Sequence, residues 1–396
     1  MNNLDDIYQE FGSNICLAPF IAGWYSTASE QNTLRPCSVT YGNWDFTENT
    51  ITAELNNDRW INLRKMFIHG SCHDNLSCIT CSQSEKNNSV SFRQQNNKSY
   101  AEMLPVDLVD TVKKIIKNDY KVDQIHVLEY FPSNYCTYEC IMCNGGASSA
   151  RGTFELKNFG KKSKLFSNPY APDFYEVLHK LNVLNLTGGE TILQPQLHKL
   201  IDYLIEHNIA KNVIITMLTN CSSFPDQLVY KFKQFKDCYY TLSLDGVEDV
   251  IEYQRRGAVW SEVSANAIKI NKTFGSVVNY VLTAVNVFSF DKFVAWLHQQ
   301  HLDIVFVSLE NTTGYLSVET IPDALKLPLI EKLKAEKNKY TEQWCVDLLS
   351  NVIDILTSVT HKPHLVEQFV THILIEDRAS KKPLIEVVPE WRPYFE

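Results

Sequence analysis

The chain has 396 residues, of which 44% are hydrophobic and 21% charged, proportions typical of a soluble globular protein with one large and one smaller domain. Its formal net charge of −9 argues against nucleic acid as a partner, because non-specific binding to phosphates requires a basic surface. The acidic N-terminus does not resemble a signal peptide, and no apolar run reaches the roughly 18–20 residues of a membrane span. We therefore expect a cytoplasmic protein that has no membrane partner.

The first 100 residues predict a small segment built from a hairpin and a helix. A strand-like stretch at 16–20, followed by polar turn residues, favours a hairpin that brings Cys16 near Cys37. Apolar residues recur at helical spacing over 58–69. The polar segment 86–100, rich in Asn and Gln, is typical of a linker.

Cysteines are the chemically informative residues of this segment and of the middle of the chain. The chain has 11 of them, and the odd number without an export signal indicates metal ligands in a reducing cytosol rather than disulfides. The N-terminal group comprises Cys16, Cys37, Cys72, Cys78 and Cys81, and the central group comprises Cys136, Cys140 and Cys143. The remaining three, Cys221, Cys238 and Cys345, are expected to be small buried hydrophobes.

Cys78 and Cys81 form a C-x2-C pair that, with two more distant cysteines, makes a four-thiolate site. Four thiolates suit either zinc or an iron–sulfur cluster, and the residues alone do not decide between them. The adjacent Cys72-His73 pair is a rival that could replace one of the four donors.

Strands and helices alternate between residues 105 and 325, which favours a parallel sheet or barrel. An amphipathic helix over 105–118 opens this region. Strands are expected near 126–131, 182–187, 212–218, 239–244, 278–286 and 303–309, and helices near 172–180, 194–207, 224–235, 260–272 and 290–299. Six such units predict an α/β fold with an open, partial (β/α)6 TIM-like barrel. Helical patterns at 323–337 and 343–358 predict a C-terminal helical extension.

The central cysteines follow the first of these strands at C-x3-C-x2-C spacing. Parallel α/β barrels carry their chemistry at the carboxyl ends of their strands. Thiolates from Cys136, Cys140 and Cys143 can hold three irons of a [4Fe–4S] cluster, because such clusters take cysteine ligands. The fourth iron would then be open to a cofactor.

Other strand ends carry polar residues suited to a small ligand. Gly188 and Gly189 would let a ligand approach the backbone closely, and Glu190 can accept a hydrogen bond from an ammonium group. A glycine pair also makes a simple turn, so this motif alone is weak evidence. Ser243 and Asp245 end another strand and suit ribose hydroxyls.

Together these motifs resemble those of the radical S-adenosylmethionine (SAM) superfamily. The resemblance rests on the cysteine spacing, on Gly188-Gly189-Glu190, and on residues 252–260, which match a Glu-Tyr-x-Arg-x-Gly-x-x-Trp pattern. Thr219-Asn220 resembles the superfamily's Thr-Asn-Gly motif, with Cys221 in place of glycine. The resemblance implies that SAM chelates the open iron and contacts Met142, Gly188, Gly189, Glu190, Asn220, Ser243, Asp245 and Arg255. Arg255 would hold the SAM carboxylate with both arms of its guanidinium group. The neighbouring Arg256 is expected to be an exposed, ion-pairing residue.

The N-terminal segment resembles the twitch-type (SPASM-like) accessory domain of radical SAM proteins, including a C-x2-C-x3-E…S-x-R tail from Cys78 to Arg93. This resemblance implies a second, auxiliary iron–sulfur cluster of the [4Fe–4S] type. Its implied ligands are Cys16, Cys37, Cys78 and Cys81. The predicted domains are an auxiliary domain with its linker at 1–100, a radical SAM core at 105–325 and the helical extension at 326–396.

The resemblance implies an enzyme that cleaves SAM reductively to a 5′-deoxyadenosyl radical. This radical would abstract hydrogen from a peptide or small-molecule substrate, for oxidation or cross-linking. A reductase such as flavodoxin or ferredoxin would supply the electron. Two alternatives remain: a non-catalytic, metal-stapled binding protein on the same scaffold, and a zinc protein that uses both cysteine groups. The catalytic residues cannot be named, and the basic segment 151–164 is either a solvated loop or a lid.

Overall fold

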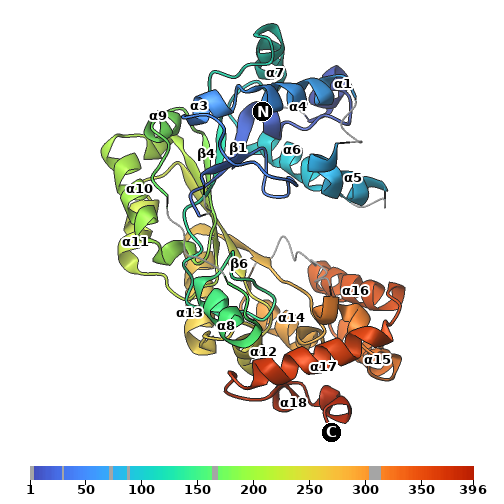
Figure 1. Cartoon of the computed structure of the whole chain (residues 1–396). Coiled ribbons are helices and arrows are strands. Elements are labelled where there is room, and N and C mark those ends of the chain that lie inside the picture. Colours follow the sequence, from blue (N-terminus) through green and yellow to red (C-terminus); the bar gives the residue numbers. More distant parts are fainter. Residues whose placement is uncertain (1–3, 29–30, 71–74, 87–89, 163–167, 303–313) are drawn as a thin grey trace. The chain divides into compact units, whose positions relative to one another are not determined.

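The computed structural model describes residues 4–28, 31–70, 75–86, 90–162, 168–302 and 314–396 (Figure 1). Seven strands in these ranges form one sheet in the order β2-β1-β3-β4-β5-β6-β7. Their bounds are β1 Ala22–Ser26, β2 Thr33–Arg35, β3 Val127–Phe131, β4 Val183–Leu186, β5 Ile214–Thr219, β6 Asp237–Ser243 and β7 Ser276–Asn279. β2 is antiparallel to β1, whereas the pairs β1–β3, β3–β4, β4–β5 and β6–β7 are parallel. The predicted α/β class with an open, parallel sheet is confirmed.

The strand predictions are correct for β3, β4, β5 and β6, and differ elsewhere. The hairpin is present, but a helical turn, α2 (Ala18–Ile21), occupies part of the expected strand at 16–20, and β1 follows it. The expected strand 278–286 ends at Asn279, because the Asn286 amide then donates to the carbonyls of Asp245 and Val281 at 3.0 and 2.9 Å. The expected strand 303–309 lies outside the described residues.

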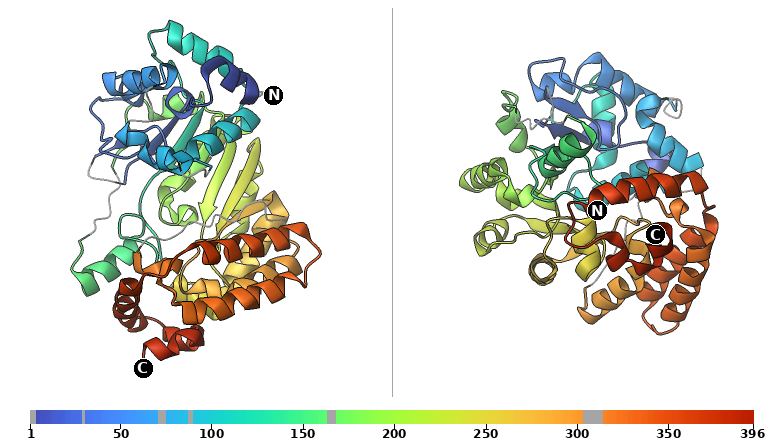
Figure 2. Two further views of the ribbon diagram at one scale, coloured as in Figure 1. Left: turned by 90° about the vertical axis from the view of Figure 1, so that its right-hand side faces the viewer. Right: turned by 60° about the horizontal axis from the view of Figure 1, so that its bottom comes forward.

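Helices flank the strands along the chain. Those before β7 are α1 Leu4–Phe11, α3 Ile51–Glu54, α4 Asp58–Ile68, α5 Ile79–Lys86, α6 Phe92–Met103, α7 Leu108–Lys117, α8 Ser149–Phe159, α9 Phe174–Leu178, α10 Pro195–Glu206, α11 Asp226–Phe232, α12 Glu248–Gln254 and α13 Trp260–Phe274. Those after it are α14 Phe290–Gln299, α15 Asp323–Lys337, α16 Gln343–Ser358, α17 Pro363–Asp377 and α18 Leu384–Val387. α15 and α16 pack against each other in the C-terminal part of the chain (Figure 2). No helix within the described ranges is long and apolar enough to span a membrane.

Two helices occupy segments that the sequence predicted otherwise. α6 lies in the expected linker 86–100, and it begins at a capping box in which Ser91 and Gln94 bond each other's backbone N–H groups. α8 lies in the basic segment expected as a loop, because Ser148 caps its start and Gly160, at φ 66°, ends it. Both departures arise from local capping chemistry.

The chain divides into two compact units, each made of three segments. Unit 1 comprises Met1–Asn134, Leu165–Met217 and Tyr230–Cys238, and unit 2 comprises Tyr135–Lys164, Leu218–Val229 and Tyr239–Glu396. The border crosses β5 and β6, so both strands contribute to both units. The predicted domain boundaries differ from these units, and they stay a prediction.

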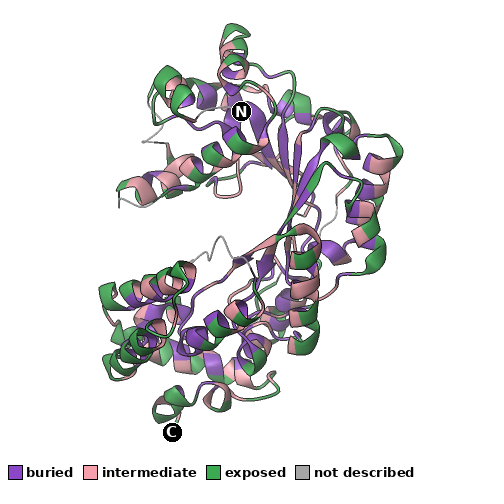
Figure 3. Ribbon diagram, turned by 180° about the vertical axis from the view of Figure 1, so that it is seen from behind, coloured by how far each residue is buried: buried purple, intermediate pink, exposed green. Residues whose placement is uncertain are grey.

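Strands supply much of the core of unit 1 (Figure 3). Tyr25, Tyr130 and Phe174 are fully buried there, with ring centroids 5.4–5.9 Å apart. Side chains of a strand alternate between its two faces, so the residues next to Tyr25 and Tyr130 in the sequence point to the opposite face of the sheet. The fold therefore separates one apolar face of this part of the sheet from a second face.

That second face carries a polar row, which the reading of these strands as buried hydrophobic runs missed. Arg35, Trp24, Glu129, Asn185 and Thr216 are register partners across β2, β1, β3, β4 and β5, and all five are half-buried. The Arg35 guanidinium lies 3.7 Å from the Trp24 ring centroid, and the Thr216 hydroxyl donates to Asn185 Oδ1 at 2.6 Å. Burial raises the pKa of Glu129 to about 7, although Arg35 and a hydrogen bond from Trp24 oppose this rise.

Candidate functional site

The central cysteines lie in a loop of unit 2, after β3 in the sequence. Cys136 and Cys140 are buried and Cys143 is half-buried. Burial raises the pKa of the Cys140 thiol to about 12; the nearby Cys143 and Cys136 thiols add to this rise, and Arg255 opposes it. The three sulfurs therefore share one electrostatic environment. The loop folds tightly, because the Cys143 N–H donates to the Cys140 carbonyl at 3.0 Å.

Arg255 lies at this loop, as the sequence predicted. Its Nη1 is 3.9 Å from Cys140 Sγ, and its Nη2 is 2.6 Å from Asp245 Oδ2. Asp245 has no solvent exposure and also accepts the Val281 N–H at 2.7 Å, which fixes its carboxylate. Burial works against the charge of Arg255, yet Asp245 and the Cys140 thiol raise its pKa. The Asp245 carboxylate thus fixes the position of the Arg255 guanidinium.

Asn220 also reaches the cysteines, since its Nδ2 lies 3.9 Å from Cys136 Sγ. Its Oδ1 accepts the Ser222 N–H at 2.9 Å, which orients the amide. Cys221 is fully buried and adopts φ 60°, the left-handed conformation that favours glycine. Cys221 therefore adopts a backbone conformation that glycine would favour at this position. Cys238 and Cys345 are also buried, as predicted.

Two other predicted contacts, Met142 and Ser243, are also in unit 2. Met142 is half-buried directly before Cys143, and Ser243 is buried at the end of β6. Their roles toward adenine and ribose stay predictions.

Gly188, Gly189 and Glu190 belong to unit 1, so their role beside the cysteines stays a prediction. Gly188 adopts φ 135°, and a Cβ there would lie 2.7 Å from the Gln194 amide nitrogen. The Gln194 amide itself is buried and bonds Ser133 at 3.0 and 3.2 Å. Glycine is therefore required by a close approach, and the sequence reading missed the Ser133–Gln194 pair that creates it.

The environment of Arg256 differs from the one expected from the sequence. We expected an exposed ion-pairing arginine, but Arg256 is buried and its Nε lies 2.9 Å from Glu139 Oε2. Arg151, expected in a solvated loop or lid, is also buried and pairs with Glu376 at 2.8 Å. Both arginines support the cysteine loop from within unit 2.

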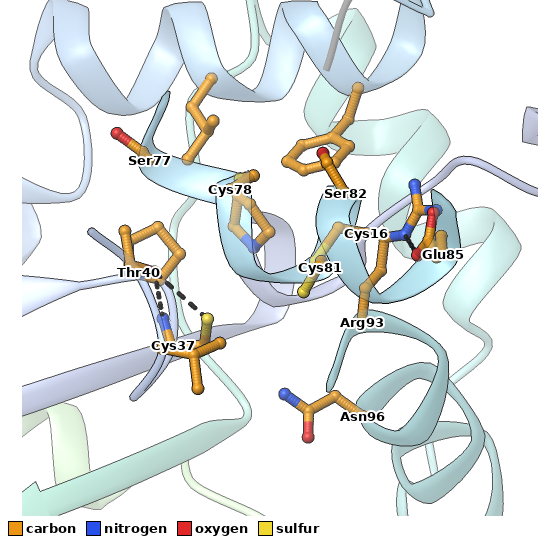
Figure 4. Close-up of a pocket in the computed structure, with 15 residues that line it drawn as sticks. Cys16, Cys37, Thr40, Ser77, Cys78, Cys81, Ser82, Glu85, Arg93 and Asn96 are labelled. Atoms are coloured by element: carbon orange, nitrogen blue, oxygen red, sulfur yellow. Dashed lines mark hydrogen bonds and ion pairs between the residues drawn. The ribbon is translucent and has the colours of Figure 1, made fainter. Parts of the chain in front are cut away.

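The four N-terminal cysteines, all in unit 1, line a single pocket (Figure 4). Cys16 is buried, and Cys37, Cys78 and Cys81 are half-buried. Burial raises the pKa of the Cys16 thiol, and the other three thiols raise it further. In the described parts of the chain, no three His, Cys, Asp or Glu side chains are grouped as they would be around a single metal ion. The rival pair Cys72-His73 lies outside these parts.

The polar tail that follows Cys81 closes one side of this pocket. Glu85 accepts a hydrogen bond from Ser91 Oγ at 2.6 Å and from Arg93 Nε at 3.1 Å. Arg93 is buried and forms an ion pair with Glu85. The E…S-x-R pattern seen in the sequence is therefore a three-residue clamp that joins α5 to α6 beside the cysteines.

The match to a known protein family covers the part of the chain that contains the cysteine loop. The sequence model of the Radical SAM superfamily matches residues 130–298, the range from β3 to α14. Residues 130–298 therefore match a Radical SAM domain. A search of curated proteins found no match.

Solved structures similar to this chain include anSMEcpe with bound AdoMet, at 15% identity and a TM-score of 0.36. That alignment covers 45% of this chain and 50% of anSMEcpe, so it spans half the length of that protein. Streptococcus suis SuiB bound to S-adenosylmethionine is similar at 16% identity and a TM-score of 0.38, over 80% of this chain and 69% of SuiB. SuiB bound to the precursor peptide SuiA is similar at 15% identity and a TM-score of 0.38, and the alignment covers 80% of this chain and 68% of SuiB.

Proposed function

We propose that the chain is a radical SAM enzyme whose SAM-binding [4Fe–4S] cluster is held by Cys136, Cys140 and Cys143. The observation that carries this proposal is that three thiols lie in one loop of the matched region and that Arg255, which follows α12, lies beside Cys140. When bound, the cluster and SAM supply a reductive cleavage that yields a 5′-deoxyadenosyl radical able to abstract hydrogen from a substrate.

The residues around the loop fit a ligand that carries a carboxylate. Arg255 Nε is buried and has no hydrogen-bond partner among the described residues. Because a buried unpaired donor is costly, a carboxylate that accepts from it would relieve that cost. Arg255 would hold the SAM carboxylate, and Asp245 would keep its guanidinium in place. Gly188, Gly189 and Glu190 would receive the ammonium group.

For the N-terminal pocket we propose an auxiliary [4Fe–4S] cluster held by Cys16, Cys37, Cys78 and Cys81. Four thiols around one pocket support full ligation by the protein, which suits electron transfer rather than substrate binding. The net reaction would then be an oxidation or cross-linking of a peptide or small molecule. A flavodoxin or ferredoxin would reduce the enzyme.

Anaerobic reconstitution with iron and sulfide, followed by dithionite and SAM, tests both sites. We expect about eight irons per chain and slow formation of 5′-deoxyadenosine. Cys136→Ala should remove about four irons and all 5′-deoxyadenosine, while the double change Cys78→Ser and Cys81→Ser should remove the other four and leave SAM cleavage intact.

Two results would contradict parts of this proposal. About four irons in the parent protein, lost with Cys136→Ala, would leave the N-terminal site to zinc, which metal analysis would then find. A full central cluster without 5′-deoxyadenosine, with or without candidate peptides, would argue against SAM cleavage.

A further inference from the structure

Beside the cysteine loop, unit 2 contains a buried cluster of charges to which helix α17 contributes Glu376. Glu376 of α17 has no solvent exposure. Its carboxylate accepts from Arg151 Nη1 and Nη2 at 3.0 and 2.8 Å, and Arg256 Nη2 lies 3.0 Å away. Arg256 Nη1 also donates to the Glu376 carbonyl at 3.1 Å. One carboxylate thus pairs with two arginines that belong to distant parts of the sequence.

Arg256 passes this restraint to the cysteine loop. Its Nε lies 2.9 Å from Oε2 of Glu139, which stands between Cys136 and Cys140 in the sequence. The backbones run together here, because the Glu139 N–H donates to the Arg256 carbonyl at 2.8 Å and the Ile141 N–H donates to the Gln254 carbonyl at 2.9 Å. Arg255, whose Nη1 approaches Cys140, lies between these two anchor points.

Packing around the arginines restricts the loop further. The Arg151 and Arg256 guanidinium carbons lie 4.7 and 4.3 Å from the Phe154 ring centroid. The Tyr253 hydroxyl donates to Asp377, the neighbour of Glu376, at 2.7 Å. A Cβ at Gly257 would come within 3.2 Å of the Thr137 carbonyl, so this segment and the loop are in close contact.

We propose that Glu376 is a positioning residue of the SAM site, which makes α17 part of the catalytic apparatus. The inference rests on the proposed function of the cysteine loop. A buried arginine that loses its carboxylate must find water or another partner, because an uncompensated buried charge is strongly unfavourable. Arg256 would then release Glu139, and Arg255 and the Cys140 sulfur would shift with the backbone segment that carries them.

The test compares Glu376→Gln with the parent in the full-length, reconstituted protein, with SAM itself as the probe. We expect at least tenfold weaker SAM binding. We also expect loss of the change that SAM causes in the EPR spectrum of the reduced central cluster, while most of the iron is retained. The control is Asp291→Asn in the same unit, which removes the charge of a less deeply buried carboxylate paired with Lys332 at 2.8 Å. The control should bind SAM within twofold of the parent.

Glu376→Gln removes the carboxylate that pairs with two buried arginines, and the variant can unfold for that reason alone. A second variant therefore tests the inference without this risk. The Glu139 side chain is 33% exposed, and Glu139→Gln therefore cuts the link to the loop without burying a new charge. Glu139→Gln should weaken SAM binding about threefold. As in Glu376→Gln, the change that SAM causes in the EPR spectrum should be lost. Parent-like SAM affinity and EPR in a folded Glu376→Gln, or in Glu139→Gln if the first variant unfolds, would overturn the inference. Absence of a central cluster in the parent would instead overturn the proposed function, and the inference with it.

Discussion

Cys221 holds a backbone conformation that an L-residue adopts at a cost. Its φ is 60°, its side chain is fully buried, and its carbonyl accepts the Asn266 amide at 2.9 Å. Left-handed backbone costs a residue with a Cβ roughly 1–2 kcal/mol, and glycine avoids this cost. The surrounding bonds thus fix a turn that the residue itself disfavours.

We therefore predict that Cys221→Gly is more stable than Cys221→Ala by about 1 kcal/mol, the reverse of the usual order of these residues. Both variants lose the same buried sulfur, so their difference isolates the backbone conformation. Urea unfolding followed by circular dichroism measures it. An alanine variant as stable as the glycine variant would show that the turn relaxes when the thiol is removed.

Glu129 is the titratable residue at the centre of the polar row. Burial raises its pKa from 4.5 to about 7. Between these two pH values the folded protein binds more protons at Glu129 than the unfolded chain does, so stability falls as pH rises. The stability that protonated Glu129 contributes is complete below pH 4.5 and is lost as pH rises through about 7.

Glu129→Gln should remove that dependence. Because glutamine does not titrate, the variant should gain stability relative to the parent as pH rises from about 4.5 to 7.5, by at most about 3 kcal/mol. Denaturant unfolding at several pH values measures the difference. Parallel stability curves for parent and Glu129→Gln would contradict the raised pKa.

At the scale of elements, the clamp of Glu85, Ser91 and Arg93 joins α5 to α6 beside the N-terminal pocket. Breaking a buried ion pair by removing one partner costs about 3–5 kcal/mol, because the remaining charge is uncompensated. Glu85→Gln should therefore loosen α5, which carries Cys81, and speed the loss of metal from this pocket to a chelator. The measurement is metal per chain against time.

Ser84→Ala is the matched control, since Ser84 is a half-buried residue of the same helix whose hydroxyl donates to the Thr80 carbonyl. It should retain metal like the parent. Equal rates of metal loss in both variants would mean that the clamp does not hold the site.

The comparison of sequence and structure also belongs to this scale. Strands β3 to β6 could be predicted because short, mainly apolar runs followed by polar turn residues have few other interpretations. α6 could not, because its buried face includes Asn97, whose amide bonds the backbone of Ile15 and Leu17 in place of apolar contact. Periodicity detects apolar faces, and it does not detect a buried polar side chain.

The candidate site divides in the same way. The cysteines and Arg255 stand in motifs with fixed spacing, so the sequence was enough to select them. Glu376 and Arg151 are separated by 225 residues, and no local pattern links them. The sequence therefore selected the candidate ligand-binding groups, and missed the contacts that hold those groups in place.

At the scale of the whole molecule, the predicted core 105–325 is not self-contained within the sheet. β1, from the first 100 residues, pairs in parallel with β3 from Ala22 opposite Val127 to Ser26 opposite Phe131. In unit 2, Trp391 is fully buried, and its indole N–H donates to the Ala284 carbonyl at 2.9 Å. The Trp391 ring lies 4.4 Å from that of Phe369. The N-terminal segment thus contributes a strand to the sheet of the predicted core, and the C-terminal segment contributes a buried side chain that packs against that core.

We predict that a fragment of residues 105–325 fails to fold cooperatively. Without β1, β3 becomes an exposed apolar edge, which favours aggregation. Loss of a fully buried tryptophan alone costs about 3–5 kcal/mol, a large part of a typical domain's stability. Near-UV circular dichroism and thermal unfolding, compared with the full chain, measure the outcome. A single cooperative transition in a monomeric fragment that also binds about four irons would show that the core is an independent domain, and that the flanking segments are additions to it.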